Sequence, residues 1–266
     1  MPLINLNGID LHYHCDDFSS PWQNTTPVIL IHSAGGNIHR WTQWMPNLAK
    51  SRPVIRFDLR GHGESSNGTL IESVDQLIDD IKCLLDALNL SEVHVIGASA
   101  GGVISIKLAE TLSPYIKTLT LVASTPFLAK TDINTQTWGE ILRTQGTEAW
   151  LKADSDLRFG QNTPQHVIDW YGQEGAKTPS GTVISLQSVL LAQNYANILS
   201  SIKTPTLILA SRVDGITPPA AQETLNNNLP NSNLMWFENV GHNMKLEIPD
   251  QLSNVCVNFM NNNDAN

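Results

Sequence analysis

The sequence predicts an α/β protein with a mostly parallel, doubly wound sheet, an N-terminal hairpin and an inserted helical segment. Short apolar runs alternate with helical patterns along most of the 266 residues, an order typical of parallel strands connected by helices. A Gly-x-Ser-x-Gly motif joins one of these runs to a helical pattern. A chain of this length buries about 70% of its unfolded surface, so one large domain is the simplest organisation.

The N-terminal segment has the pattern of a β-hairpin. Residues 3–6 and 9–14 flank Asn7-Gly8, which is the strongest two-residue turn signal. The string at residues 12–16 has the composition of a metal site, His-Tyr-His-Cys-Asp. Strand alternation explains it better, and no second cluster completes a coordination shell. We therefore expect no metal site here.

Alternating strands and helices follow the hairpin. Continuous apolar runs predict buried strands at 28–32 and 54–57, with a short helix at 41–48 between them. Ser73 and Gln76 form a capping box, which marks the start of a helix. Apolar residues recur at the helical period after it, namely Val74, Leu77, Ile78, Ile81, Leu84, Leu85 and Leu88.

The Gly-x-Ser-x-Gly motif at residues 97–101 predicts a nucleophile elbow. It follows a predicted strand at 92–96 and precedes a helical pattern that runs to Leu112. In this setting the serine lies on a strained strand-to-helix turn that exposes its hydroxyl, and only small neighbours fit. The neighbours are small here, Ala98, Ala100, Gly101 and Gly102. Ser99 is therefore the candidate nucleophile, and the alternative is a glycine-rich turn with a capping serine.

The pattern of alternating strands and helices resumes in the last third of the chain. Buried strands are predicted at 118–123, 206–210 and 234–237, and helices begin near 218 and 249. In a doubly wound sheet of this kind, ligands bind at the carboxyl ends of the strands.

Between residues 125 and 200 the strands are missing. We interpret 125–200 as a helical lid inserted in a core formed by 1–124 and 201–266. Its predicted helices lie at 138–142, 149–152, 165–171 and 185–198. Apolar residues available to line a pocket are Phe127, Leu128, Trp138, Trp150, Trp170 and Tyr171. We select Trp138 and Trp170 as substrate-binding residues; the alternative for each is packing between lid helices.

The net charge and the N-terminal residues indicate a cytoplasmic protein that acts on a small molecule. The net charge of −9 argues against binding to nucleic acid or anionic membranes. The N-terminus has neither a basic flank nor an apolar stretch of signal-peptide length, and no later run reaches membrane length. The cysteines form no metal-spaced or redox pair and are expected to be buried thiols; they are Cys15, Cys83 and Cys256.

A serine nucleophile needs a base, and the base needs an orienting group. Asp214 follows the strand at 206–210, and His242 follows the next strand. The chain order Ser99, Asp214, His242 is the order expected after a nucleophile elbow. Glu238 is the alternative acid, but it lies too close in sequence to His242 to reach its far nitrogen easily.

The negative charge that develops during acyl transfer needs preformed donors. We expect the backbone N–H of Ala100 at the start of the elbow helix, and that of Ala34 in the loop at 32–37. The alternative for this loop is a flexible glycine turn. His32 and His62 precede the nucleophile and are expected to support loops rather than react.

Together these motifs resemble the α/β-hydrolase fold superfamily over nearly the whole chain. Asp58 to Ser65 resembles the loop after the fourth strand of that superfamily, and Gly241-His242 resembles its terminal histidine turn. The resemblance implies Ser99 as nucleophile, His242 as base and Asp214 as orienting acid. It also implies oxyanion donors at Ala34 and Ala100, with no cofactor.

The N-terminal residues 1–13 and the Ser33-Ala34-Gly35 loop also resemble the 3-oxoadipate enol-lactonase-like and carboxylesterase branch. A dicarboxylate substrate would need a basic pocket. The basic residues of the lid are accompanied by a comparable number of acids; they are Lys130, Arg143, Lys152, Arg158 and Lys177.

The leading hypothesis is a serine hydrolase that cleaves a small carboxylic ester or lactone through an acyl-enzyme. One alternative keeps the triad and cleaves a carbon–carbon bond in ring-cleavage products. The other is a ligand receptor or regulator with a retained triad. Turnover separates the two enzymes from the receptor.

Overall fold

The computed structural model describes residues 2–6, 8–65, 70–131 and 133–265. The strands are β1 (Leu3–Leu6), β2 (Ile9–Asp16), β3 (Val28–Ile31), β4 (Val54–Phe57), β5 (Val93–Ala98), β6 (Ile116–Val122), β7 (Thr206–Ser211) and β8 (Ser232–Phe237). The core helices are α1 (Met45–Ser51), α2 (Val74–Ala87), α3 (Ala100–Thr111), α9 (Pro219–Asn228), α10 (Met244–Glu247) and α11 (Pro249–Asp264). The lid helices are α4 (Thr135–Thr144), α5 (Gly146–Ala153), α6 (Ser155–Arg158), α7 (Gln165–Gly175) and α8 (Ser180–Leu191). Short 3-10 helices lie at η1 (Ile38–Trp44), η2 (Ser113–Tyr115), η3 (Leu128–Lys130) and η4 (Leu199–Ser201).

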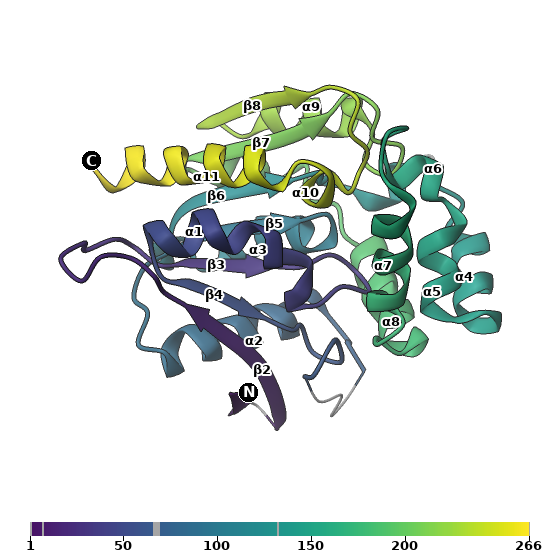
Figure 1. Ribbon diagram of the computed structural model, residues 1–266, viewed down its shortest axis with the longest axis horizontal. Coiled ribbons are helices and arrows are strands. Elements are labelled where there is room, and N and C mark those ends of the chain that lie inside the picture. The colour runs from purple at the N-terminus through teal and green to yellow at the C-terminus, as the bar shows by residue number, and fades with distance from the viewer. Residues whose placement is uncertain (1, 7, 66–69, 132, 266) are drawn as a thin grey trace.

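The strands form one twisted sheet in the order β1-β2-β4-β3-β5-β6-β7-β8 (Figure 1). β1 pairs with β2, and β2 with β4, in antiparallel fashion, whereas the other pairs are parallel. The predicted fold class, a mostly parallel sheet with an N-terminal hairpin, is confirmed. Of the predicted hairpin turn, Gly8 has a left-handed φ of +77°, and Asn7 lies outside the described residues.

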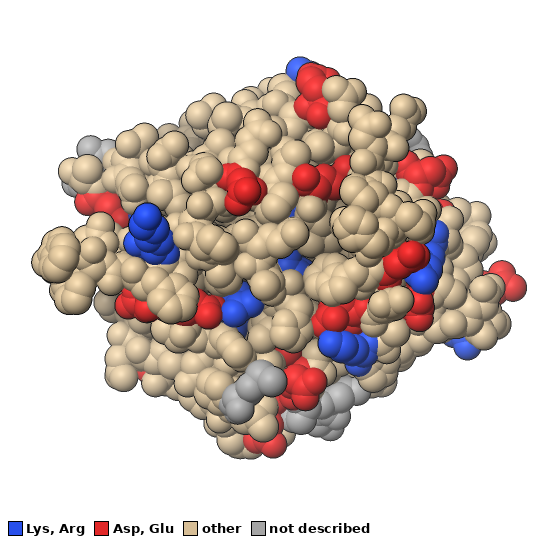
Figure 2. All heavy atoms as spheres, in the orientation of Figure 1, with Lys and Arg blue, Asp and Glu red and all other residues tan. Residues whose placement is uncertain are grey.

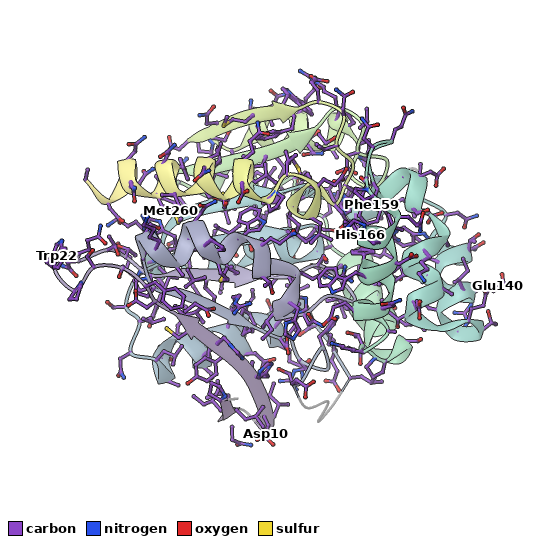
Figure 3. The ribbon with its side chains drawn as sticks, in the orientation of Figure 1. Asp10, Trp22, Glu140, Phe159, His166 and Met260 are labelled. Atoms are coloured by element: carbon purple, nitrogen blue, oxygen red, sulfur yellow. The ribbon has the colours of Figure 1, made fainter. Side chains whose placement is uncertain are left out.

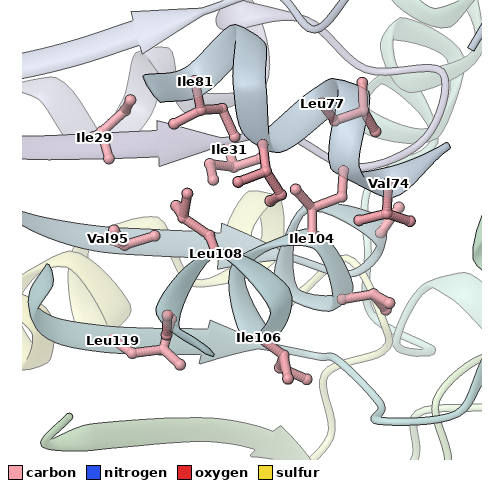
Figure 4. Close-up of a cluster of buried hydrophobic side chains, with 14 of the residues drawn as sticks. Ile29, Ile31, Val74, Leu77, Ile81, Val95, Ile104, Ile106, Leu108 and Leu119 are labelled. Carbon is pink, nitrogen blue, oxygen red and sulfur yellow. The ribbon is translucent and has the colours of Figure 1, made fainter. Parts of the chain in front are cut away.

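Helices cover both faces of the sheet because the buried strands are apolar on both sides. Ile29 and Ile31 of β3 pack in the cluster that contains α2, α3 and α9, and Figure 4 shows α2 and α3 over these strands. Val28 and Leu30 point the other way, into a cluster with η1, α1 and α11. The sheet is thus the central layer of three, and the carboxyl ends of its parallel strands face the lid (Figure 1).

Helix boundaries follow the local signals. Ser73 Oγ accepts a hydrogen bond from Gln76 N–H (3.1 Å) and starts α2 as predicted. The single helix predicted at 41–48 is instead η1 followed by α1, with a proline in the first turn of α1; a proline lacks the N–H that would continue a helix through this point.

The helix predicted at 185–198 starts earlier and ends earlier, as α8. After Leu191 the Asn194 side chain accepts a hydrogen bond from Ala196 N–H (3.1 Å). This local side-chain bond replaces the next helical turn.

The lid helices lie between β6 and β7 in sequence and gather at one end of the sheet (Figure 1). Their apolar side chains form a small cluster that includes Trp138, Trp150 and Tyr171 and also contains Ile216 and Leu246 of the core. In Figure 3, Glu140 marks this end of the molecule and Trp22 the opposite end. The boundaries 125–200 for the lid stay a prediction.

The cysteines are less buried than expected. Cys256 is buried, but Cys83 is only partly covered and Cys15 is exposed. β1 begins at Leu3, which pairs with His12, so the last residues of β2 pair with β4 alone and Cys15 lies at a sheet edge. On the face shown in Figure 2, Lys and Arg side chains are scattered and lie close to acidic ones.

None of the helices in the described residues is both long enough and apolar enough to span a membrane.

Candidate active site

Ser99 lies on the sharp turn between β5 and α3. Its backbone has φ +53° and ψ −118°, a conformation that residues other than glycine rarely adopt. The turn also requires glycine on both sides. A Cβ on Gly97 would collide with Ser105 Oγ, and one on Gly101 would collide with Ile31 O. The motif therefore forms the elbow predicted from its small residues.

The structure brings Ser99, His242 and Asp214 together in one hydrogen-bonded chain. Ser99 Oγ lies 2.8 Å from His242 Nε2, and His242 Nδ1 lies 2.9 Å from Asp214 Oδ2. A carboxylate only accepts hydrogen bonds, so Nδ1 carries the ring proton. His242 Nε2 is then free to accept a proton from the Ser99 hydroxyl.

Asp214 is fixed by hydrogen bonds from its own loop. Its Oδ1 accepts from the N–H groups of Ile216 and Thr217, each at 2.8 Å. Its Oδ2 accepts from Thr217 Oγ1 at 2.7 Å. Glu238 is exposed, and its nearest charged partner is Arg212, with Nε 3.8 Å from Oε1. Glu238 is therefore not the acid that contacts His242.

A cavity of about 40 Å³ opens in front of Ser99. Ala34 and Ala100 line it on the core side. Ala100 is the first residue of α3, and the first N–H groups of a helix have no partner within the helix. Both backbones are thus next to the serine, and their role as oxyanion donors stays a prediction.

The lid closes the cavity with apolar and aromatic side chains, among them Leu128, Trp138, Trp150 and Tyr171. Trp138 lines the cavity and donates a hydrogen bond from Nε1 to Asp154.

Trp170 does not line this cavity, which corrects the prediction that it is a substrate-binding residue. It is 36% exposed and lines an outer groove with His39 and His166. Successive residues of a helix point about 100° apart, so Tyr171 faces inward where Trp170 cannot.

Arg158 is a cavity residue that the sequence did not single out. It lines the cavity although it is a cation, and its side chain is 3% exposed. It ends α6, a single turn between two longer helices. A turn this short has no periodicity from which the direction of its side chains can be inferred.

Two buried histidines support the loops around the site, as expected. His32 Nε2 accepts a hydrogen bond from Leu59 N–H (2.9 Å), and its Nδ1 donates to Ser33 O (2.9 Å). Burial lowers the pKa of His32 to about 4, so the ring stays neutral and keeps both bonds. His62 Nδ1 donates to Arg60 O (3.1 Å).

The string at residues 12–16 contributes to this support. His12 Nδ1 donates to Asp58 Oδ2 (2.7 Å), and Asp58 Oδ1 accepts from Ile38 N–H (2.7 Å). Among the residues that the structure describes, no group of three His, Cys, Asp or Glu side chains is arranged to hold a metal ion.

The sequence profile of the alpha/beta hydrolase fold family matches residues 26–167, more than half of the chain. The chain belongs to this family. Several relatives cover most of its length, including the following two. The putative carbamate hydrolase RutD of Azorhizobium caulinodans is 24% identical over 97% of this hydrolase-fold chain and 98% of its own. The pimeloyl-[acyl-carrier protein] methyl ester esterase of Nitrosomonas europaea is 26% identical over 86% and 93%.

A third relative shares only a segment. The dihydrolipoyllysine-residue acetyltransferase component of the acetoin cleaving system of Pseudomonas putida is 37% identical over 99 residues, 37% of this chain and 27% of that protein.

Solved structures repeat the hydrolase fold over the full length. The enol-lactonase from Burkholderia xenovorans LB400 has a TM-score of 0.90 at 22% identity, over 98% of this chain and 100% of its own. The meta-cleavage product hydrolase from Pseudomonas fluorescens IP01 has a TM-score of 0.83 at 21% identity, over 100% and 98%. At these identities the likeness is one of fold.

Proposed function

We propose that this hydrolase-fold protein is a serine hydrolase that cleaves a small carboxylic ester or lactone. The observation that carries the proposal is the continuous chain from Asp214 through His242 to Ser99, which ends at a cavity. A serine hydroxyl at the end of such a chain is activated for attack on a carbonyl carbon.

The reaction follows from these positions. His242 Nε2 accepts the hydroxyl proton as Ser99 Oγ attacks the carbonyl carbon, and the Ala34 and Ala100 N–H groups stabilise the oxyanion. The positive end of the α3 dipole adds to this stabilisation. His242 then returns the proton to the leaving alcohol, and an acyl-enzyme remains. A water molecule, deprotonated by His242, releases the acid and restores Ser99.

The size of the cavity and the relatives support the substrate class. A cavity of about 40 Å³ holds only a few water-sized groups, which favours a short acyl part. Relatives include a methyl ester esterase by name, and the enol-lactonase shares the fold.

A substrate panel tests the proposal. It contains p-nitrophenyl esters from acetyl to hexanoyl, a lactone, a carbamate and a ring-cleavage diketone. We expect the short esters and the lactone to turn over fastest. If the protein is instead a carbon–carbon hydrolase, the diketone should turn over fastest. If it is a receptor, none of these compounds should turn over.

Covalent catalysis is tested on Ser99 directly. A fluorophosphonate is expected to label the protein once, on Ser99, as located by mass spectrometry. Ser99→Ala should keep the melting temperature and lose turnover on the order of a million-fold. A label on another residue, or substantial turnover by pure Ser99→Ala, would contradict the assignment.

A further inference from the structure

Arg158 is a buried cation with unused hydrogen-bond donors in the wall of the cavity. Its side chain is 97% buried, with 3% exposed, and it lines the cavity that contains Ser99. Within the described residues, its Nε and Nη2 atoms have no hydrogen-bond partner. Nor does it take part in any ion pair found in this part of the chain. A guanidinium in this state is prepared to bind an anion.

Aromatic stacking holds the guanidinium but leaves its donors unused. Its central carbon lies 4.9 Å from the ring centre of Trp138 and 4.8 Å from that of Trp150. Such contacts stabilise a cation through the ring faces. They do not satisfy the N–H groups on Nε and Nη2, which have no hydrogen-bond partner in the described part of the chain, and the planar guanidinium fork matches a carboxylate in geometry.

The backbone around Arg158 is tied to the two loops that carry the acid and the histidine. Leu157 O accepts a hydrogen bond from Gly215 N–H (3.1 Å), and Arg158 O accepts one from Asn243 N–H (2.8 Å). Phe159, the next residue, lies where the lid meets the sheet (Figure 3). Arg158 therefore has a fixed position relative to Asp214 and His242.

Two other buried basic residues, Lys245 and Arg40, lie within electrostatic range of Arg158. Lys245 is 2% exposed and Arg40 is 1% exposed. The pKa of Lys245 is lowered to about 7, first by burial and then by the charges of Arg40 and Arg158, against the opposite effect of Asp214 and Glu247. Arg158 is thus near two other basic groups, and the carboxylates of Asp214 and Glu247 act on the same region.

We propose that Arg158 binds a carboxylate on the acyl part of the substrate, so that the preferred substrates are half-esters of short dicarboxylic acids. This inference rests on the proposed serine hydrolase. The acyl part stays bonded to Ser99 while the alcohol leaves, and Arg158 lines the cavity that encloses this bond. Arg158 is then a specificity-determining residue that anchors the acyl part through both steps. Water adds to the acyl-enzyme, and a dicarboxylic acid is released.

The test compares anionic and neutral substrates of equal size. Monomethyl succinate, glutarate and adipate carry the carboxylate, and the corresponding methyl succinamate, glutaramate and adipamate replace it with a neutral amide. For at least one chain length, we expect wild-type kcat/KM to favour the anion about 10- to 100-fold, as a charged hydrogen bond does. Equal or lower kcat/KM for all three anions would overturn the proposal without any variant.

Substitutions of Arg158 test whether this residue causes the preference for the anion. In Arg158→Gln the anion-to-amide ratio of kcat/KM should fall to near one, and Arg158→Lys should restore part of it, since the charge returns without the planar fork. Arg143→Gln makes the same change on an exposed arginine of α4 and should leave the ratio unchanged. A ratio that persists in Arg158→Gln assigns the preference to another cation.

Two further experiments test the carboxylate site separately from the proposed hydrolase activity. Acetoxyacetate carries its carboxylate on the alcohol part, and an Arg158-dependent preference for it would contradict the acyl-side assignment. If no ester is turned over, monomethyl glutarate is titrated into Ser99→Ala while the fluorescence of the stacked tryptophans is followed. Saturable binding that is lost in Ser99→Ala/Arg158→Gln supports the carboxylate site alone, and equal binding of methyl glutaramate rejects it.

Discussion

At the scale of single residues, the site depends on a backbone conformation of Ser99 that costs energy. Ser99 has a positive φ of +53°, which costs about 1–3 kcal/mol for a residue with a side chain. The close contacts around Gly97 and Gly101 maintain this conformation. The strain places Oγ at the start of α3, 2.8 Å from His242 Nε2.

Replacing Asp214 by Asn should lower kcat about ten-thousand-fold, because an amide that donates to Nδ1 favours the wrong imidazole tautomer. Stopped-flow or steady-state assays with the preferred ester measure this loss. Glu238→Gln is the matched control, since Glu238 is an exposed carboxylate near the same loop. A wild-type rate in Asp214→Asn, or a comparable loss in Glu238→Gln, would contradict the proposed role of Asp214.

The sequence predicted which side chains come together where chain order fixes their positions, and their catalytic roles stay a prediction. Asp214 and His242 each follow a strand of one parallel sheet, so their strand ends meet beside Ser99 whatever the lengths of the connecting helices. Arg158 and Trp170 are different, because their directions depend on how the lid helices rotate against the core. Sequence pattern does not determine that rotation for short helices.

At the scale of elements, strands were the most predictable part. Apolar runs between turns located β4 without error, and β7 to within one residue, because a buried parallel strand is apolar along its length. Helix ends were less predictable. The break between η1 and α1 depends on a proline, and the end of α8 on the Asn194 side-chain bond. Such bonds compete locally with the helix and leave little trace in a hydrophobic pattern.

Two tryptophans of the lid helices can be compared, because Trp138 lines the cavity and Trp170 does not. Trp138→Ala should raise the ratio of hexanoyl to acetyl ester turnover, because it removes a cavity wall and a pocket distinguishes one methylene by about 1–3 kcal/mol. It should also lower the free energy of unfolding by about 3–5 kcal/mol. Trp170→Ala, outside the cavity, should leave the ratio unchanged. An unchanged ratio in Trp138→Ala, or equal shifts in both, would reject the cavity wall as the cause.

At the scale of the whole molecule, the core contains several histidines that stay neutral. Burial lowers the pKa of His32 and His94 to about 4 and that of His62 to about 3. In the unfolded chain the same rings have a pKa of about 6.5. Below that pH the unfolded state binds protons that the folded state does not, so acid favours unfolding.

The free energy of unfolding should therefore fall as the pH drops from about 6.5 toward 4, by up to about 1.4 kcal/mol per pH unit for each ring. Urea denaturation at pH 7, 6 and 5 measures the slope. His62→Gln should reduce it, whereas His166→Gln, an exposed control, should not. A flat profile, or an equal change in both variants, would contradict this origin of acid sensitivity.

The hydrogen bonds from Gly215 and Asn243 to the carbonyls of Leu157 and Arg158 have a consequence for chimeras of this family. A lid transplanted from another member arrives with its own segment at this crossing. Unless that segment presents two carbonyls at the same places, the loops that carry the acid and the histidine lose their backbone partners. Grafts that retain residues 157–160 from the recipient should stay active, and those that exchange them should lose rate even on substrates that both parents accept.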